Sequence, residues 1–374
     1  MTGAMYSAVA GLKSHMNKLN VIGNNVANVN TFGYKNARAT FKESLYTSVR
    51  SGSNGSNTQG GMNPAQLGYG CNIGTIDLDM STKNYVPTGI DLDCMINGDG
   101  FFLVGSKPTV TNDGTNDSYA ITEAQNLNLT RVGNFTFDSQ GYMVDGNGSV
   151  VYGFVTCASE DDGTKSTEPG LANKDNPAVS TQLVPIRLPL ASNGNGTDAS
   201  GETIPEGTAI FPGVDDTTGA NIYDPGTDST GKPITMDSIK IDGATGKITG
   251  INSADKTAVV IGYIPIAKVS NSSGVTHLQG PYYVAGEGAG DCVAASIGGV
   301  LDGYLNNKED GTDGAVPLFG TGETKLITNG LESSGTDIAT EFSEMISTQR
   351  GYQANTRIIT VTDAMLEELV NIKR

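Results

Sequence analysis

The two ends of this chain carry helical patterns that a single helix cannot bury by itself. Near the start, apolar residues recur at alternating spacings of four and three, at Met5, Val9, Leu12, Met16 and Leu19. This spacing is typical of the apolar seam of a coiled coil. Gly23 and Val26 continue the register, so the sequence predicts one amphipathic helix over about residues 4–29. A seam this narrow needs a partner helix.

A second helix is predicted at the other end of the chain. The preceding Ser334–Asp337 segment fits a capping-box start. Apolar residues then recur mostly every seven positions, and the predicted seam comprises Ile338, Phe342, Met345, Tyr352, Ile359, Leu366 and Val370. Because each terminal helix needs a partner, we expect the two to pair with each other as a coiled coil.

Between the ends, the pattern changes to the period of two that is typical of strands, interrupted by Gly, Asn and Asp turns. The 50 glycines and the 17 % of charged residues also indicate a turn-rich, mostly β body. We expect a terminal helical domain (1–30 plus 337–374), a linker (31–70) and an inner β domain (71–156 plus 236–330). A Gly-, Asp-, Thr-, Ser- and Pro-rich outer β domain (157–235) is expected to be inserted into the inner one.

Charge and hydropathy exclude several partners. The net charge of −17 predicts that nucleic acids are repelled, and no basic cluster is present that would attract an anionic membrane. The longest apolar runs, such as Ala258–Ala267, are too short to span a bilayer, so no membrane insertion is expected. The N-terminus lacks the pattern of a cleaved signal peptide, so any export is expected to use another route.

The sequence contains little that points to catalysis, and we expect no enzyme activity, cofactor or metal site. The HExxH, GxSxG and phosphate-loop patterns are missing. The four cysteines (Cys71, Cys94, Cys157 and Cys292) form no CxxC pair, which argues against a zinc site or a disulfide scaffold. Cys94 alternates with apolar neighbours and is predicted to lie in the core.

Three separate stretches resemble the bacterial flagellar rod and hook protein family. The first, Met5–Phe41, ends with the family's Asn-rich motif at Asn28, Asn30, Thr31, Gly33, Tyr34 and Lys35. The last, Leu331–Arg374, is similar to the family's closing helix. Within the body, "INGDGFFLV" and "LTRVGNFTFDSQGYMVDGNG" resemble the family's first β domain.

The resemblance implies a structural subunit of the motility apparatus that self-assembles into a homopolymer, a hollow helical tube. It implies export through the flagellar export apparatus to an extracellular position, and partners that include rod, hook-cap and hook–filament junction proteins. The additional material near 157–235 favours a hook subunit, which forms a curved universal joint, over the distal rod protein. A secreted β-rich adhesin or binding module is a further alternative, but it leaves the paired terminal seams unexplained.

Neutral amides are unusually frequent on the predicted terminal helices, at Asn17, Asn24, Asn28, Gln353 and Asn355. Asparagine is a poor residue for helix interiors because its amide competes for backbone hydrogen bonds. In the tube that the resemblance implies, these amides either face a wetted channel or bond helix to helix in the packed layer. Cys157 has two interpretations as well: a shielded thiol, or a covalent link to a neighbouring subunit's lysine after loss of sulfur.

Overall fold

A computed structural model describes residues 2–55, 60–107, 110–112, 117–119, 126–159, 166, 169–172, 178–180, 182–196, 203–214, 221–222, 229–297 and 324–372. The chain divides into two compact units. The terminal unit combines Met1–Asp79 with Ser334–Arg374, and the body is Met80–Ser333. Helices form the two ends and strands form most of what lies between, so the expected mostly β fold with helical termini is confirmed.

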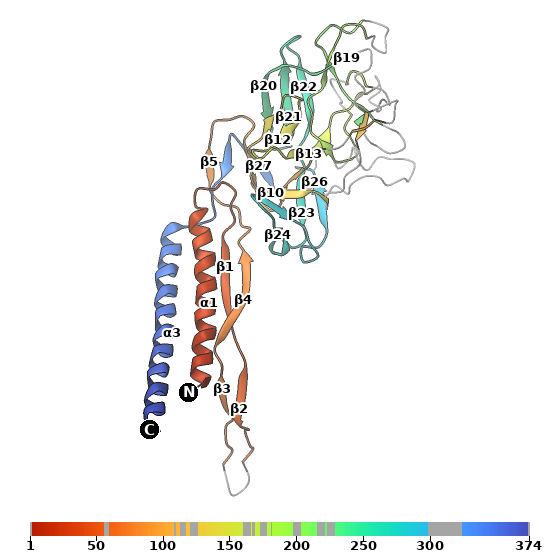
Figure 1. The fold of residues 1–374 in the computed structure, drawn as a ribbon. Coiled ribbons are helices and arrows are strands. Elements are labelled where there is room, and N and C mark those ends of the chain that lie inside the picture. Colours follow the sequence, from red (N-terminus) through yellow and green to blue (C-terminus); the bar gives the residue numbers. More distant parts are fainter. Residues whose placement is uncertain are drawn as a thin grey trace. The chain divides into compact units, whose positions relative to one another are not determined.

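The terminal unit contains two long helices, α1 (Thr2–Ala27) and α3 (Ile338–Ile372), which lie side by side (Figure 1). The predicted pairing of the two ends is therefore confirmed. Asp337 is the N-cap of α3, because its carboxylate accepts hydrogen bonds from the Ala339 amide at 3.2 Å and from the Thr340 hydroxyl. These bonds hold the pKa of Asp337 below its usual value.

Two antiparallel hairpins complete the terminal unit. Strand β1 (Ala37–Glu43) pairs with β4 (Cys71–Leu78), and β2 (Tyr46–Arg50) pairs with β3 (Ala65–Gly68). Three of these strands lie within 31–70, where the sequence predicted a linker. All five residues of β2 are exposed, so this strand lacks the apolar–polar alternation by which a half-buried strand is recognised.

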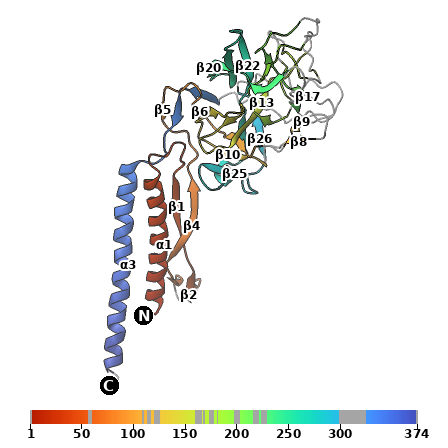
Figure 2. The ribbon, with the colours of Figure 1, turned by 45° about the horizontal axis from the view of Figure 1, so that its top comes forward.

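The hairpin β1–β4 contacts α1, as Figure 2 shows from a second direction. The buried Ser14 hydroxyl makes one of the links between them, because it lies 3.0 Å from the Cys71 carbonyl and 2.9 Å from the Ala10 carbonyl of its own helix. Helix α1 therefore has α3 on one side and a β hairpin on another.

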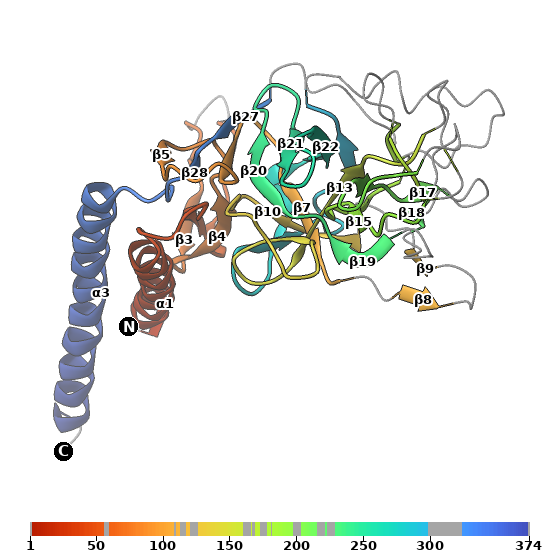
Figure 3. The ribbon, with the colours of Figure 1, turned by 90° about the horizontal axis from the view of Figure 1, so that it is seen from above.

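The body is built on one large antiparallel sheet with the strand order β20-β21-β22-β13-β7-β10-β25-β24, and part of it is visible in Figure 3. Strands β11, β12 and β14 attach to this sheet beside β13. The bounds of these strands are β7 (Phe102–Gly105), β10 (Asn128–Thr130), β11 (Thr136–Phe137), β12 (Met143–Val144), β13 (Val150–Val155), β14 (Val184–Pro185), β20 (Met236–Ile241), β21 (Lys247–Asn252), β22 (Ala258–Tyr263), β24 (Thr276–His277) and β25 (Tyr282–Val284).

Smaller sheets surround the large one. Three have two strands each: β5 (Tyr85–Pro87) with β28 (Gly330–Glu332), β6 (Cys94–Asn97) with β27 (Lys325–Thr328), and β23 (Ile266–Val269) with β26 (Cys292–Ala295). A three-stranded sheet has the order β16 (Ala209–Ile210), β15 (Leu190–Ser192) and β19 (Ser229–Pro233). A four-stranded sheet has the order β17 (Gly213–Val214), β18 (Asn221–Ile222), β9 (Asp117–Tyr119) and β8 (Val110–Asn112). A short 3₁₀ helix, η2 (Ser272–Gly274), precedes β24.

The core of the body collects buried apolar side chains from both halves of the expected inner domain, such as Phe102 and Ile261, and also from the expected insertion, such as Val184 and Ile186. Strands from 157–235 add small clusters around Phe211 and Leu190, and the first of these includes Val259 from outside that segment. Cys94 is fully buried in the main core, as predicted, and burial raises the pKa of its thiol. The division of the body into an inner and an inserted outer domain stays a prediction.

Candidate assembly surface

The contact between α1 and α3 is made by small and polar residues. A Cβ atom added to Gly11 would lie 2.7 Å from Nδ2 of Asn355, and one added to Gly351 would lie 2.8 Å from Cε1 of His15. Two buried threonines, Thr348 and Thr362, lie on the same side of α3. Asn355 and His15 therefore each pack over a glycine of the other helix, where a larger residue would have to displace them.

The helices run antiparallel, and their register follows from four contacts. Asn25 meets Glu341, His15 meets Gly351 and Gly11 meets Asn355, while Lys18 Nζ lies 2.9 Å from Glu344 Oε2. Each later position on α1 therefore meets an earlier one on α3. In this register α1 begins opposite the residues near Thr362.

The last turns of α3 consequently extend past the start of α1, as Figure 1 shows. This overhang exposes apolar side chains, and the exposed fraction reaches 81 % at Ile372. The exposed apolar residues of the overhang are Met365, Leu366, Leu369, Val370 and Ile372. A helix end of this kind offers apolar area to a partner.

Asn25 lies where α1, β1 and α3 meet, and its side chain is only 1 % exposed. Its Nδ2 donates to the Ala37 carbonyl at 2.8 Å and to Glu341 Oε1 at 2.9 Å. Its Oδ1 accepts from the Ala37 amide at 3.0 Å and from the Tyr34 hydroxyl at 3.1 Å. We call these four groups the asparagine junction: Asn25, Tyr34, Ala37 and Glu341.

The remaining motif residues shape the loop that leaves α1. Asn24 Nδ2 donates to the Tyr34 hydroxyl at 3.1 Å, Asn28 Nδ2 donates to the Asn24 carbonyl at 2.9 Å, and the Thr31 hydroxyl donates to Asn28 Oδ1 at 3.2 Å. Gly33 has a φ of 67°, a left-handed conformation that favours glycine. The other two motif residues differ in exposure: Asn30 is exposed and Lys35 is buried.

Burial shifts the pKa of three groups at the helix contact. Burial raises the pKa of Tyr34, and the nearby carboxylate of Glu341 adds to this. Burial likewise raises the pKa of Glu341, while the hydrogen bond from Asn25 opposes the rise. The pKa of His15 is lowered, mainly by burial and also by the charge of Lys18. In all three groups the pKa shift disfavours the charged form, because burial removes that form from water.

The predicted apolar seams contain both half-buried and exposed residues in the single chain. Their half-buried members are Met5, Leu12, Leu19, Met345 and Ile359. Their exposed members are Val9, Met16, Ile338, Phe342, Tyr352, Leu366 and Val370. On α1 the buried positions, such as Ala8 and Ile22, lie roughly a quarter of a turn away from the seam.

The amide side chains predicted from sequence also differ in where they lie. Asn355 lies in the helix contact, against Gly11, while Asn17 is half-buried and Gln353 is exposed. The predicted set omitted Asn25, which makes a direct hydrogen bond between the two helices. It also omitted Gly11 and Gly351. A search for small residues at helical spacing finds these glycines, whereas a search for apolar residues does not.

The terminal unit has little core of its own. Its only buried apolar side chains among the described residues are Ala8, Ile22 and Ala39. Of 26 large apolar side chains that are exposed in the described part of the chain, 22 belong to the terminal unit and 4 to the body. The apolar surface of this protein is therefore concentrated on the unit that is least able to bury it within one chain.

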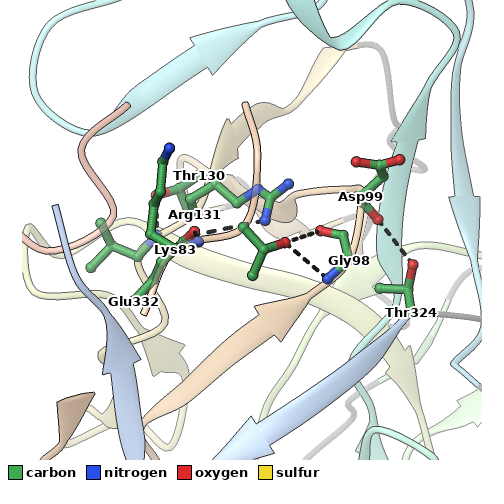
Figure 4. Close-up of polar contacts among 9 residues, drawn as sticks. Lys83, Gly98, Asp99, Thr130, Arg131, Thr324 and Glu332 are labelled. Carbon is green, nitrogen blue, oxygen red and sulfur yellow. Dashed lines mark hydrogen bonds and ion pairs between the residues drawn. The ribbon is translucent and has the colours of Figure 1, made fainter. Parts of the chain in front are cut away.

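The body contains a buried ion pair, which Figure 4 shows. One of its members, Glu332, lies on β28, the last strand before the chain leaves the body. Arg131 Nη1 and Glu332 Oε2 lie 3.9 Å apart, and each side chain is 1 % exposed. Glu332 Oε1 accepts from the Lys83 amide at 2.8 Å, and the Arg131 guanidinium lies 5.3 Å from the centre of the Phe101 ring. Burial lowers the pKa of Arg131, while Glu332 opposes that shift. The pair therefore links the exit strand β28 to the core.

Within the described ranges, no group of three His, Cys, Asp or Glu side chains is arranged to hold a metal ion. No helix in the described part of the chain is long and apolar enough to cross a membrane. Cys157 is fully buried, with its thiol 3.5 Å from the Val155 carbonyl.

Comparison with known proteins agrees with the helical ends described above. The profile of the flagella basal body rod protein family matches residues 5–35, and that of the flagellar basal body rod FlgEFG protein C-terminal family matches residues 328–372. These ranges cover most of α1 with its asparagine loop, and all of α3.

Full-length relatives extend the match to the body. The chain is 32 % identical to the flagellar basal-body rod protein FlgG of Bacillus subtilis over 375 aligned positions that cover all of both chains. It is 26 % identical to the flagellar hook protein FlgE of Borreliella burgdorferi over 462 positions, again covering all of both. A crystal structure of Helicobacter pylori flagellar hook protein FlgE2 matches 56 % of this chain and 96 % of its own, at 12 % identity and a TM-score of 0.28, too low to bear on the fold.

These matches define the chain as a structural component of the bacterial flagellum. It belongs to the flagellar rod and hook protein family, as its terminal motifs indicated. That family is a structural family and not an enzyme family, and its membership implies polymeric assembly with other flagellar components.

Proposed function

We propose that this chain is the hook subunit of the flagellum, which assembles into a curved hollow tube and acts as a universal joint between rod and filament. The observation that carries the proposal is the concentration of exposed apolar side chains on the terminal unit. A surface of this composition is stable in water only when copies of the chain cover it for one another.

The terminal unit supports assembly in a second way. The β2–β3 hairpin has only two strands and exposes Tyr46, Val49 and Leu67. A two-stranded hairpin is marginally stable alone, so contact with neighbouring copies supplies the missing stabilisation. Identical subunits can contact each other head to tail, through two different patches of their surface. Such contacts build an open helical assembly when the rotation from one subunit to the next does not bring the chain of subunits back to its start.

In the proposed tube, the apolar seam residues of α1 and α3 meet helices of neighbouring subunits. The exposed members, among them Val9, Met16 and Phe342, are available for this because they are exposed in the single chain. The amides Asn17 and Gln353 are then candidates for the channel wall, and Asn24, Asn28 and Asn355 for bonds within and between helices. A channel lined by neutral amides is wetted without attracting charged chains that pass through it.

The composition of the body favours the hook over the rod. Strands β14 to β18 fall within the predicted insertion, and β19 ends it. A body with polar, glycine-rich loops suits weak contacts that change as a hook bends. The distal rod protein is the second candidate, and the observation that favours it is the 32 % identity to a FlgG relative over the whole chain.

The proposed position is outside the cell, at the flagellar basal body, reached through the flagellar export apparatus. The proposed partners are the rod below, the cap protein during growth and the junction proteins above. These assignments rest on the family and on the proposed function.

The test combines assembly of the purified chain with loss of the gene. We expect the full-length chain to form curved tubes in negative-stain images at rising concentration. Cells without the gene are expected to carry complete rods that lack hooks. Straight tubes together with truncated rods would instead establish the rod protein, and the lack of any polymer would contradict both candidates.

A further inference from the structure

The side chain of Asn25 uses its whole hydrogen-bonding capacity. A primary amide offers two donors and two acceptor lone pairs. At Asn25 both donors and both lone pairs are engaged, toward the Ala37 backbone, the Tyr34 hydroxyl and the Glu341 carboxylate, at 2.8 to 3.1 Å. These partners belong to the loop after α1, the start of β1 and the first turn of α3.

The chemistry at this position requires an asparagine. Aspartate has the same shape but no donor when ionised, and it would place a second carboxylate against Glu341. Glutamine adds a methylene to a side chain that is 1 % exposed. Alanine would leave the Ala37 amide and carbonyl without their side-chain partner in a buried position, which is costly.

We propose that Asn25 is a positioning residue that couples the docking of α3 to the ordering of the loop and hairpin that follow α1. The fourth hydrogen bond of Asn25 exists only when α3 is docked, so the two ends of the chain become ordered together. A subunit then presents its assembly surface only when both of its ends are in place. This inference rests on the proposed function, because the surface in question is the one that forms the tube.

The electrostatic surroundings make the coupling testable through pH. The groups near Glu341 are Glu344 on α3, Asp337 just before α3, Lys18 on α1 and Tyr34 in the loop. In an Asn25→Asp variant two carboxylates would face each other across the distance of a hydrogen bond. When both are ionised they repel, whereas one shared proton restores a hydrogen bond between them.

The experiment compares full-length wild type, Asn25→Asp, the double variant Asn25→Asp/Glu341→Gln and the control Asn30→Asp. Asn30 is exposed in the same loop, so its variant carries the same change in charge away from the junction. Tube yield is measured by sedimentation and negative-stain imaging between about pH 5 and pH 8, and hydrogen exchange is measured on the unassembled chains.

We expect Asn25→Asp to raise the critical concentration for tubes about tenfold at the upper pH, which corresponds to about 1.4 kcal/mol, and to regain assembly toward the lower pH. The double variant should lose this pH dependence, because the amide introduced at position 341 can donate to the carboxylate introduced at position 25. Wild type and Asn30→Asp should not show it. In the unassembled Asn25→Asp chain, the first turns of α3 should exchange faster than in wild type at the upper pH.

Assembly of Asn25→Asp that matches wild type at all pH values would overturn the inference, as would an equal defect in Asn30→Asp. If wild type forms no tube at all, the proposed function fails, and hydrogen exchange then decides the coupling by itself. Unchanged exchange in α3 of Asn25→Asp would overturn the coupling in that case.

Discussion

Asn25 and Glu341 are 316 positions apart in sequence, and their side chains lie 2.9 Å apart in the fold. The chain leaves the terminal unit after β4, builds the whole body and returns to place the start of α3 against the end of α1. The proposed assembly surface is therefore complete only when the two ends of the chain have come together.

The helix contact predicts opposite outcomes for two glycines of α1. Gly11→Ala should displace the Asn355 side chain from the helix contact and lower tube yield, because its Cβ would lie 2.7 Å from Nδ2 of Asn355. Gly23→Ala is the matched control, since nothing lies within 4 Å of its Cβ. In the control, alanine should stabilise the helix by up to about 1 kcal/mol. Circular dichroism and sedimentation of both variants check this, and equal behaviour of the two would contradict the contact.

The overhang of α3 predicts an assembly defect without a folding defect. Leu369→Ser and Ile372→Ser remove apolar area that is 47 % and 81 % exposed in the single chain. Tube formation should require a higher protein concentration, while the helical signal of the unassembled chain stays the same. Leu278→Ser, at a body residue that is 43 % exposed, is the control and should assemble as wild type. An equal defect in the control would show that the terminal unit has no special part in assembly.

The ion pair between Arg131 and Glu332 predicts a large cost for removing one partner. Glu332→Gln leaves the Arg131 charge buried without its counter-charge, which should lower the free energy of unfolding by about 3–5 kcal/mol. Arg131→Met/Glu332→Gln removes both charges and should recover most of this loss. Urea unfolding followed by tyrosine fluorescence measures both, since the chain has 14 tyrosines and no tryptophan.

An exposed ion pair serves as the control for this prediction. Asp237 and Lys256 lie 2.6 Å apart at the surface, where ion pairs contribute little. Asp237→Asn should therefore change the unfolding curve only slightly. A double variant of the buried pair that is as unstable as the single variant would contradict the account of Arg131 and Glu332.

His15 predicts a dependence of helix stability on pH. Its pKa is lowered from 6.5 in the folded chain, so the unfolded chain binds the proton more readily. The stability that comes from neutral His15 is therefore fully present above about pH 6.5 and is lost as pH falls through the lower, folded pKa. Thermal unfolding of the helical signal should fall less steeply on acidification in His15→Gln than in wild type. Identical pH profiles would show that His15 does not titrate in the helix contact.

The existence of the terminal helices and their pairing could be predicted from sequence, because a 4-3 apolar pattern has no other common explanation. The contact face could not. A strict seven-residue repeat drifts by about 20° per heptad around a straight helix, so Ile338 and Leu366 cannot both face one partner. The residues that do meet, such as Gly11 with Asn355, are small or polar and leave no apolar signal.

The hairpins of the terminal unit and the asparagine junction were missed for other physical reasons. All residues of strand β2 are exposed within one chain, so its sequence does not need to alternate between apolar and polar residues. The importance of Asn25 depends on Ala37 and Glu341, and the latter lies at the far end of the chain. A hydrogen bond between such distant residues has no periodic signature in the sequence.

The central claim is that the exposed apolar side chains of the terminal unit are the surface that assembly buries. Hydroxyl-radical footprinting of unassembled chains and of tubes tests it most directly, because Met16 and Met365 are 48 % and 50 % exposed in the single chain and methionine oxidises readily. We predict that both methionines lose most of their reactivity in the tube while Tyr85 of the body keeps its own. Equal oxidation of Met16 and Met365 in tubes and in unassembled chains would contradict the account.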